Sequence, residues 1–173
     1  TPAHLRAVVN SVEKIKPNKR KIKNKPSLSS GMKRVELIQE PRPLIVGERI
    51  NAQGSRKVKE YLLKNDYDSI LNIAKHQVEN GAHVLDVCVA LTERSDEAAQ
   101  MSKIVKLLSH SIETPIMIDS TEPTVIHAAL KAFPGRAIIN SVNLEKGSER
   151  IDLVMPLAKK YGSPIIAMCI DEI

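Results

Sequence analysis

The sequence is poor in cysteine and has no long apolar run. Its only cysteines, Cys88 and Cys169, lie far apart in apolar surroundings, so neither a disulfide framework nor a paired-cysteine zinc site is predicted. No stretch approaches the roughly 18 apolar residues of a membrane span, and the N-terminus lacks the pattern of a secretory signal. We therefore predict a cytoplasmic protein with no membrane contact and two free thiols.

Motifs for metals and phosphates are also missing. The segment Gly54-Ser55-Arg56-Lys57 lacks the spacing of a phosphate-binding P-loop. Histidine pairs with metal-ligand spacing are absent as well, the five histidines being His4, His76, His83, His110 and His127. We therefore predict no metal site in this chain.

Positive charge is confined to the first quarter of the chain. Residues 1–43 hold 11 Lys and Arg against 3 Asp and Glu, whereas residues 44–173 hold 15 against 17. The basic run from Lys14 to Lys25 contains no aromatic residue on which a nucleic-acid base could stack. We interpret it as a solvated linker and predict no nucleic-acid binding. A basic-tailed interaction module is the non-enzymatic alternative.

The chain divides into three segments. Thr1 and Pro2 are typical of a helix start, and the spacing of the apolar residues predicts a helix over residues 3–15. Residues 16–43 are rich in Lys, Ser and Pro and end at the Pro41-Arg42-Pro43 breaker, so they predict an extended basic linker. With 42% apolar residues in the whole chain, residues 44–173 can form one compact domain.

Short apolar runs alternate with longer amphipathic runs from residue 44 onward. This alternation predicts an α/β fold of parallel strands and crossover helices. The predicted strands are Leu44–Val46, His83–Val87, Pro115–Ile118, Ala137–Ile139 and Pro164–Met168. The predicted helices are Tyr67–Asn80, Ser95–Ser111, Pro123–Phe133 and Gly147–Tyr161.

Polar side chains follow each predicted strand where it ends. They are Glu48, Arg49 and Asn51 after the first strand, then Asp86, Asp119, Asn140 and Asp171 after or at the ends of the others. The carboxyl ends of parallel barrel strands open on one face, so these residues should converge. One such carboxylate can be a turn residue, but a series suggests a ligand. Carboxylates and an amide suit a 2-amino-4-oxo heterocycle.

Several of these motifs resemble the pterin-binding barrel of cobalamin-dependent methionine synthase. They are Gly47-Glu48-Arg49-Ile50-Asn51 with Gly54-Ser55-Arg56-Lys57, Leu85-Asp86-Val87, Ile118-Asp119-Ser120-Thr121-Glu122-Pro123, Ile138-Ile139-Asn140-Ser141-Val142-Asn143 and Ala158-Lys159-Lys160-Tyr161-Gly162. Methyltetrahydrofolate:corrinoid methyltransferases share these motifs, and dihydropteroate synthase is a more distant relative. The resemblance covers residues 44–173 and implies the N-terminal portion, about five strands, of a TIM (β/α)8 barrel.

The resemblance implies a substrate and a set of binding residues. Asp119 and Asn140 would hydrogen-bond the pterin of methyltetrahydrofolate, with Asp86, Glu48 and Asn51 at the same mouth. The methyl group on N5 would pass to cob(I)alamin, bound by a module or corrinoid protein outside this chain, during methionine synthesis from homocysteine. Residues 1–15 resemble the last helix of an upstream homocysteine-binding domain, which would carry the zinc. No catalytic residue is assigned.

Two departures from the family pattern limit what this chain is expected to do. Many members have Asn where this chain has Cys88, which puts one pterin contact in doubt. The sequence stops at Ile173, after the fifth predicted strand, so we expect the fragment alone to be inactive, with open sheet edges that favour association. The alternatives are a dihydropteroate synthase-like pterin enzyme and a non-catalytic fragment.

Overall fold

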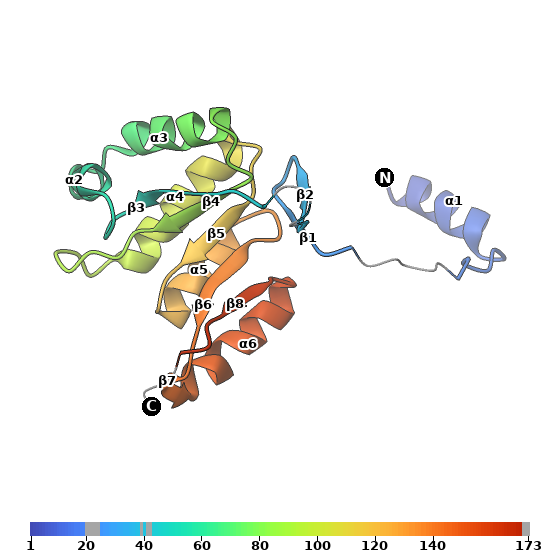
Figure 1. Cartoon of the computed structure of the whole chain (residues 1–173). Coiled ribbons are helices and arrows are strands. Elements are labelled where there is room, and N and C mark those ends of the chain that lie inside the picture. Colours follow the sequence, from blue (N-terminus) through green and yellow to red (C-terminus); the bar gives the residue numbers. More distant parts are fainter. Residues whose placement is uncertain (20–24, 39, 41–42, 171–173) are drawn as a thin grey trace.

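The centre of the structure is a five-stranded parallel sheet (Figure 1). The computed structural model describes residues 1–19, 25–38, 40 and 43–170. Strands that are consecutive along the sheet are parallel. In order they are β3 (Val46–Asn51), β4 (Val84–Cys88), β5 (Ile116–Asp119), β6 (Ile138–Val142) and β8 (Ile165–Ala167). The predicted α/β class with five parallel strands is confirmed.

Helices connect the strands of this sheet. A parallel neighbour can be reached only by a crossover, and every crossover here contains at least one helix. The crossover helices are α2 (Arg56–Lys64), α3 (Tyr67–Glu79), α4 (Glu97–Ser111), α5 (Pro123–Ala132) and α6 (Glu149–Tyr161). The four predicted helices are present with slightly shorter bounds, and Gly162 ends α6 in the left-handed conformation.

Three elements of the barrel segment differ from the sequence prediction. The first strand begins at Val46 and runs to Asn51, later than predicted. Helix α2 was not predicted, because five of its nine residues are charged and only Val58 and Leu62 are buried. Ser55 caps it by accepting a hydrogen bond from the Val58 backbone at 3.4 Å. The short strand β7 (Glu145–Ser148) replaces the predicted start of α6.

The two faces of the sheet bury different partners. Leu85, Val87 and Ile118 point outward into a core shared with the helices. The alternate residues Val84 and Met117 point to the other face, where they belong to a smaller cluster. We call the face with Val84 and Met117 the inner face. Successive strand residues face opposite sides, so Asp86 and Asp119, two residues further along these strands, also lie on the inner face.

A β-hairpin covers the inner face near the amino ends of the strands. Its strands are β1 (Ser27–Ser29) and β2 (Arg34–Glu36). Leu28 is fully buried against the inner-face cluster. The backbones of Ser29 and Arg136 exchange hydrogen bonds of 3.2 and 2.8 Å, and the Ser30 hydroxyl donates to the Glu113 carbonyl at 2.5 Å.

The hairpin changes the description of residues 16–43. The sequence predicts an extended linker there, but the structure packs residues 27–36 against the sheet, so ordered packing begins before Leu44. The pattern missed this because the strands have three residues each and only Leu28 is buried. The predicted Pro41-Arg42 breaker, part of the basic run and Asp171 lie outside the described residues.

The N-terminal helix α1 (Pro2–Val12) forms close to its predicted position, with Thr1 at the N-cap. None of its residues is buried, and Leu5 is 69% exposed. Its assignment to an upstream homocysteine-binding domain stays a prediction. Across the described ranges, we find no helix whose length and hydropathy would let it cross a bilayer.

Replacing Leu28 with alanine should destabilise the whole sheet. The side chain is fully buried between the hairpin and the inner-face cluster, and such truncations cost about 2–5 kcal/mol of unfolding free energy. Urea denaturation followed by circular dichroism measures the loss. Met32→Ala in the same hairpin is the control, because Met32 is 57% exposed. An equal effect of the two substitutions would show that the hairpin is not part of the core.

Candidate functional site

The five predicted site residues come together at the carboxyl ends of the first four sheet strands. Glu48 and Asn51 belong to β3, Asp86 to β4, Asp119 to β5 and Asn140 to β6. Asp86 is the most enclosed, with 2% of its surface exposed. Asn51, Asp119 and Asn140 are half-buried, and Glu48 is exposed. The predicted convergence of these side chains is therefore present in the structure.

Strand register places three of the site side chains and Cys88 in one row across the sheet. Asn51 pairs with Cys88 between β3 and β4, and Asp119 pairs with Asn140 between β5 and β6. Val87 pairs with Ile118, so the next residues along, Cys88 and Asp119, are also neighbours. The row therefore runs Asn51, Cys88, Asp119, Asn140 without a gap.

Two amides of this cluster each bind a carboxylate across an intervening strand. The Asn51 side-chain amide donates to the Asp119 carboxylate at 3.4 Å. The Asn140 amide donates to the Asp86 carboxylate at 3.3 Å. Each carboxylate thus keeps one amide donor while its other lone pairs can accept further hydrogen bonds.

The electrostatics of the cluster favour protonated carboxyls. Burial, together with the nearby Asp119 and Glu48 carboxylates, raises the pKa of Asp86 to about 7, and the hydrogen bond from Asn140 opposes this shift. Burial also raises the pKa of Asp119, with the Cys88 hydrogen bond and the Arg150 charge acting in the opposite direction. Near neutral pH, the cluster can therefore bind or release a proton.

The segment after Asp119 is held from three directions. Ser120 donates its backbone N–H to the Asn140 carbonyl at 3.2 Å and its hydroxyl to Glu97 at 3.0 Å. Arg150 of α6 donates to the Ser120 carbonyl at 3.1 Å. Sequence reasoning did not single out Glu97 or Arg150, because their contacts join segments that are distant in the chain.

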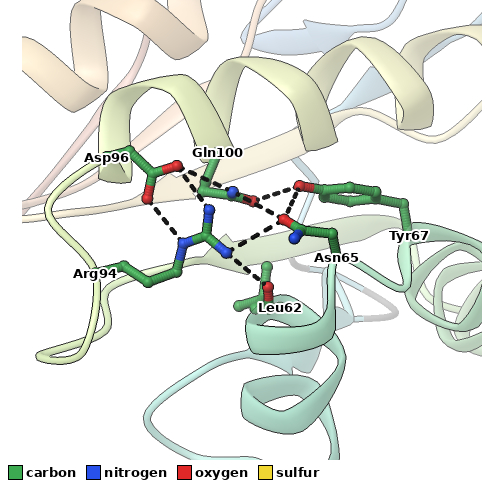
Figure 2. Close-up of polar contacts among 6 residues, drawn as sticks. All are labelled: Leu62, Asn65, Tyr67, Arg94, Asp96 and Gln100. Atoms are coloured by element: carbon green, nitrogen blue, oxygen red, sulfur yellow. Dashed lines mark hydrogen bonds and ion pairs between the residues drawn. The ribbon is translucent and has the colours of Figure 1, made fainter.

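A network of polar side chains fixes the loop that follows β4 (Figure 2). Arg94 binds both carboxylate oxygens of Asp96, at 2.8 and 2.7 Å. It also donates to the Leu62 carbonyl at 3.1 Å and to the Asn65 side chain at 3.2 Å. Gln100 of α4 donates to Asp96 at 3.2 Å and to Asn65 at 3.4 Å. The turn between α2 and α3 is thereby tied to the start of α4.

Close packing against Gln77 explains the glycine of the Gly47-Glu48-Arg49 motif. Gln77 of α3 is buried, and its side-chain oxygen accepts a hydrogen bond from the Arg49 backbone at 2.7 Å. A Cβ at position 47 would lie only 2.7 Å from that oxygen. A cavity of about 840 Å³ adjoins this edge, but of the five site residues only Glu48 lines it. The carboxylate cluster is therefore a separate feature.

The donor set fits an organic ring better than a metal ion. Within the described ranges, no group of three or more His, Cys, Asp or Glu side chains is arranged to hold a metal. Asp119 and Asp86 instead each accept a hydrogen bond from an amide on the strand two places along the sheet. Such a row can accept hydrogen bonds from ring N–H and amino groups and can donate to a ring carbonyl.

A parallel α/β sheet with polar side chains at the carboxyl ends of its strands is typical of barrel enzymes, whose active sites lie at that face. The family model described as pterin binding enzyme matches residues 47–173. The chain belongs to the pterin-binding enzyme family, as its motifs predicted.

Relatives within this family are methionine synthases. The protein from Mycobacterium tuberculosis is 41% identical over 175 residues, which cover 99% of this chain and 15% of that protein. The Mycobacterium leprae protein is 37% identical over 180 residues, with the same coverage. The chain thus spans about one seventh of the length of these relatives.

Solved dihydropteroate synthases share the fold. The Yersinia pestis enzyme, solved with a pterin–sulfa conjugate, has a TM-score of 0.57 at 20% identity, covering 84% of this chain and 50% of that one. The Vibrio fischeri enzyme has a TM-score of 0.58 at 20% identity, covering 83% and 50%. The sheet therefore corresponds to the N-terminal portion of the pterin-binding barrel.

Asp86 should make the chain less stable as pH rises from about 4 to 7. Its folded pKa is about 7, so the native state binds more protons than the unfolded state in this window. Stability is then highest at the acidic end and falls with rising pH. Asp86→Asn should flatten this decline in urea unfolding midpoints, whereas exposed Glu60→Gln should not. An unchanged pH slope in Asp86→Asn would contradict the assignment.

Arg94→Lys should loosen the loop after β4 without unfolding the sheet. Lysine keeps the charge but cannot bind Asp96 with two nitrogens and reach Leu62 and Asn65 together. Hydrogen exchange of residues 89–96 should become faster, while exchange in β5 stays the same. Arg56→Lys on the exposed surface of α2 is the matched control. Unchanged protection in Arg94→Lys would show that the network does not order this loop.

Proposed function

We propose that this chain binds the pterin ring of methyltetrahydrofolate and supports transfer of its N5-methyl group to a corrinoid in methionine synthesis. The single observation that carries the proposal is the row of Asn51, Asp119 and Asn140, with Asp86 beside it, at the carboxyl ends of adjacent strands. Membership of the pterin-binding family and the methionine synthase relatives support it.

The row suits the hydrogen-bonding edge of a pterin. The ring carries an amino group and an N–H as donors and a carbonyl as acceptor. In our proposal, Asp119 accepts hydrogen bonds from the ring amino group and N–H, and the Asn140 amide can both donate and accept. Asp86 accepts a hydrogen bond from Asn140. Glu48 and Asn51, both on β3, lie at the same carboxyl-end face of the sheet.

Methyl transfer also requires a proton on or near N5, because protonation improves the pterin as a leaving group. The pKa of Asp86 is raised to about 7, so this carboxyl can bind or release a proton near neutral pH. The cluster can therefore stabilise the protonated ring or buffer the proton without a dedicated acid. Its main contribution is to hold the ring in one orientation.

Other components of the reaction are assigned to protein outside this chain. A corrinoid held by a separate module would supply the nucleophilic cobalt that takes the methyl group. The upstream homocysteine-binding domain would contain zinc, and α1 would be its last helix. We expect this chain alone not to catalyse turnover, because it spans 15% of its methionine synthase relatives. Cytoplasmic location stays a prediction.

Dihydropteroate synthesis is the competing enzymatic proposal. Its support is the likeness to solved dihydropteroate synthases, but at about 20% identity this likeness concerns the fold. The methionine synthases match at 41% and 37% identity, so methyl transfer is favoured. A pterin pyrophosphate and aminobenzoate, offered in place of methyltetrahydrofolate, distinguish the two reactions.

Asp119→Ala and Asn140→Ala should each weaken methyltetrahydrofolate binding by at least about tenfold. Each removes a hydrogen bond that involves a charged group or an amide in a half-buried site, worth about 1.5–3 kcal/mol in the charged case. Calorimetric titration measures the change. It is made on this chain and on the Mycobacterium tuberculosis methionine synthase carrying residues 1–173 in place of its matching segment.

Lys75→Ala on the exposed surface of α3 is the control for this titration and should leave the affinity unchanged. Binding by the chimera that is lost in both site variants supports the assignment. Absence of saturable binding to a folded chimera, or wild-type affinity in both variants, contradicts it. If the chimera condensed aminobenzoate with a pterin pyrophosphate, the result would support dihydropteroate synthesis instead of methyl transfer.

A further inference from the structure

Ser120 is the first residue after β5 and directly follows Asp119. We propose that Ser120 is a positioning residue, whose buried hydroxyl holds Asp119 and Asn140 in place for the ligand. This role rests on the proposed pterin function for its purpose. The hydrogen bonds that support it are all made within the protein, so they can be tested without a ligand.

Every polar group of Ser120 has a partner in the protein. The residue is 4% exposed, so a lost partner would not be readily replaced by water. Its hydroxyl donates to the Glu97 carboxylate at 3.0 Å and accepts from the Glu122 backbone N–H at 3.1 Å. A hydroxyl has a single proton, so these two hydrogen bonds together fix its orientation.

The backbone of Ser120 connects the two residues to which the proposed function gives the ring contacts. Asp119 is the preceding residue, and the Ser120 N–H donates to the Asn140 carbonyl at 3.2 Å. Arg150 of α6 holds the Ser120 carbonyl at 3.1 Å. A displacement of Ser120 would therefore move Asp119 and weaken the link to Asn140 at the same time.

The hydroxyl anchors this backbone to two helices. Glu97 is the first residue of α4, and Glu122 is the N-cap residue of α5. The Glu122 side chain makes no capping hydrogen bond, whereas its backbone N–H is bound by the Ser120 hydroxyl. Helices α4 and α5 pack against each other. Ser120 thereby fixes the ends of β5 and β6 relative to these packed helices.

The first test uses the side-chain amides of Asn51 and Asn140 as reporters in nitrogen-15 NMR of the ligand-free chain. These amides donate to Asp119 and Asp86, respectively, so their signals depend on where β5 and β6 end. Ser120→Ala should move both signals toward those of a free asparagine amide. Spectra of Asn51→Ala and Asn140→Ala provide the assignments.

A matched control separates positioning from a general loss of stability. Ser109→Ala removes another buried hydroxyl, which donates to the Lys106 carbonyl within α4, and it should leave both amide signals unchanged. Ser120→Thr keeps a hydroxyl and should keep both signals near their wild-type positions. Unchanged signals in a folded Ser120→Ala chain, or equal shifts in Ser109→Ala, overturn the proposal.

Variants of Glu97 test the same hydrogen bond with Ser120 itself intact, so they serve if Ser120→Ala does not fold. Glu97→Ala removes the acceptor of the hydroxyl proton and should move both amide signals. Glu97→Gln keeps an acceptor oxygen and should not. Wild-type signals in Glu97→Ala would contradict the role of the hydroxyl.

The closing experiment titrates methyltetrahydrofolate into the chimera described above. Ser120→Ala should weaken binding by about tenfold, the effect expected for loss of one or two hydrogen bonds that orient the site, whereas Ser109→Ala should leave the affinity unchanged. Wild-type affinity in the Ser120→Ala chimera overturns the positioning role. Absence of binding by the unaltered chimera contradicts the proposed function instead, and the ligand-free spectra then decide whether Ser120 holds Asp119 and Asn140.

Discussion

The parallel register of β3, β4, β5 and β6 is the constraint on which the site depends. It places side chains of four strands side by side at one depth, although they are separated in sequence by about 20 to 40 residues. A shift of one residue in any strand would turn its polar side chain into the helix-facing core. Outward residues such as Val87 and Ile118 are fully buried there, so the hydrophobic packing of the helices holds the register that the polar row requires.

Two carboxylates close together in a half-enclosed row are unfavourable for the folded state. Burial raises the pKa of both carboxyls, and repulsion from Asp119 and Glu48 helps to bring that of Asp86 to about 7. Hydrogen bonds from the Asn51 and Asn140 amides offset part of this cost. A fold optimised only for stability would replace such groups with apolar ones. Their presence at the carboxyl ends of the strands is therefore best understood through a ligand that uses them.

Supporting contacts surround this row on several sides. The hairpin β1–β2 places Leu28 under its apolar layer, the Arg94 network orders the loop after β4, and Arg150 holds the backbone after Asp119. These groups are distant from one another along the chain. They restrain the backbone around the site from several sides. In the dihydropteroate synthases that share the fold, this half of the barrel is joined by about as much chain again.

The sequence by itself determined the fold class, the strand order along the chain and the identity of the polar residues that meet at one face. These follow from local patterns: apolar periodicity, glycine and proline signals, and a polar residue at each strand end. Only the tertiary structure decided which residues touch. The hydrogen bond between Asn51 and Asp119, the raised pKa of Asp86 and the packing of Leu28 depend on register and burial. Those quantities arise between segments, so no local pattern encodes them.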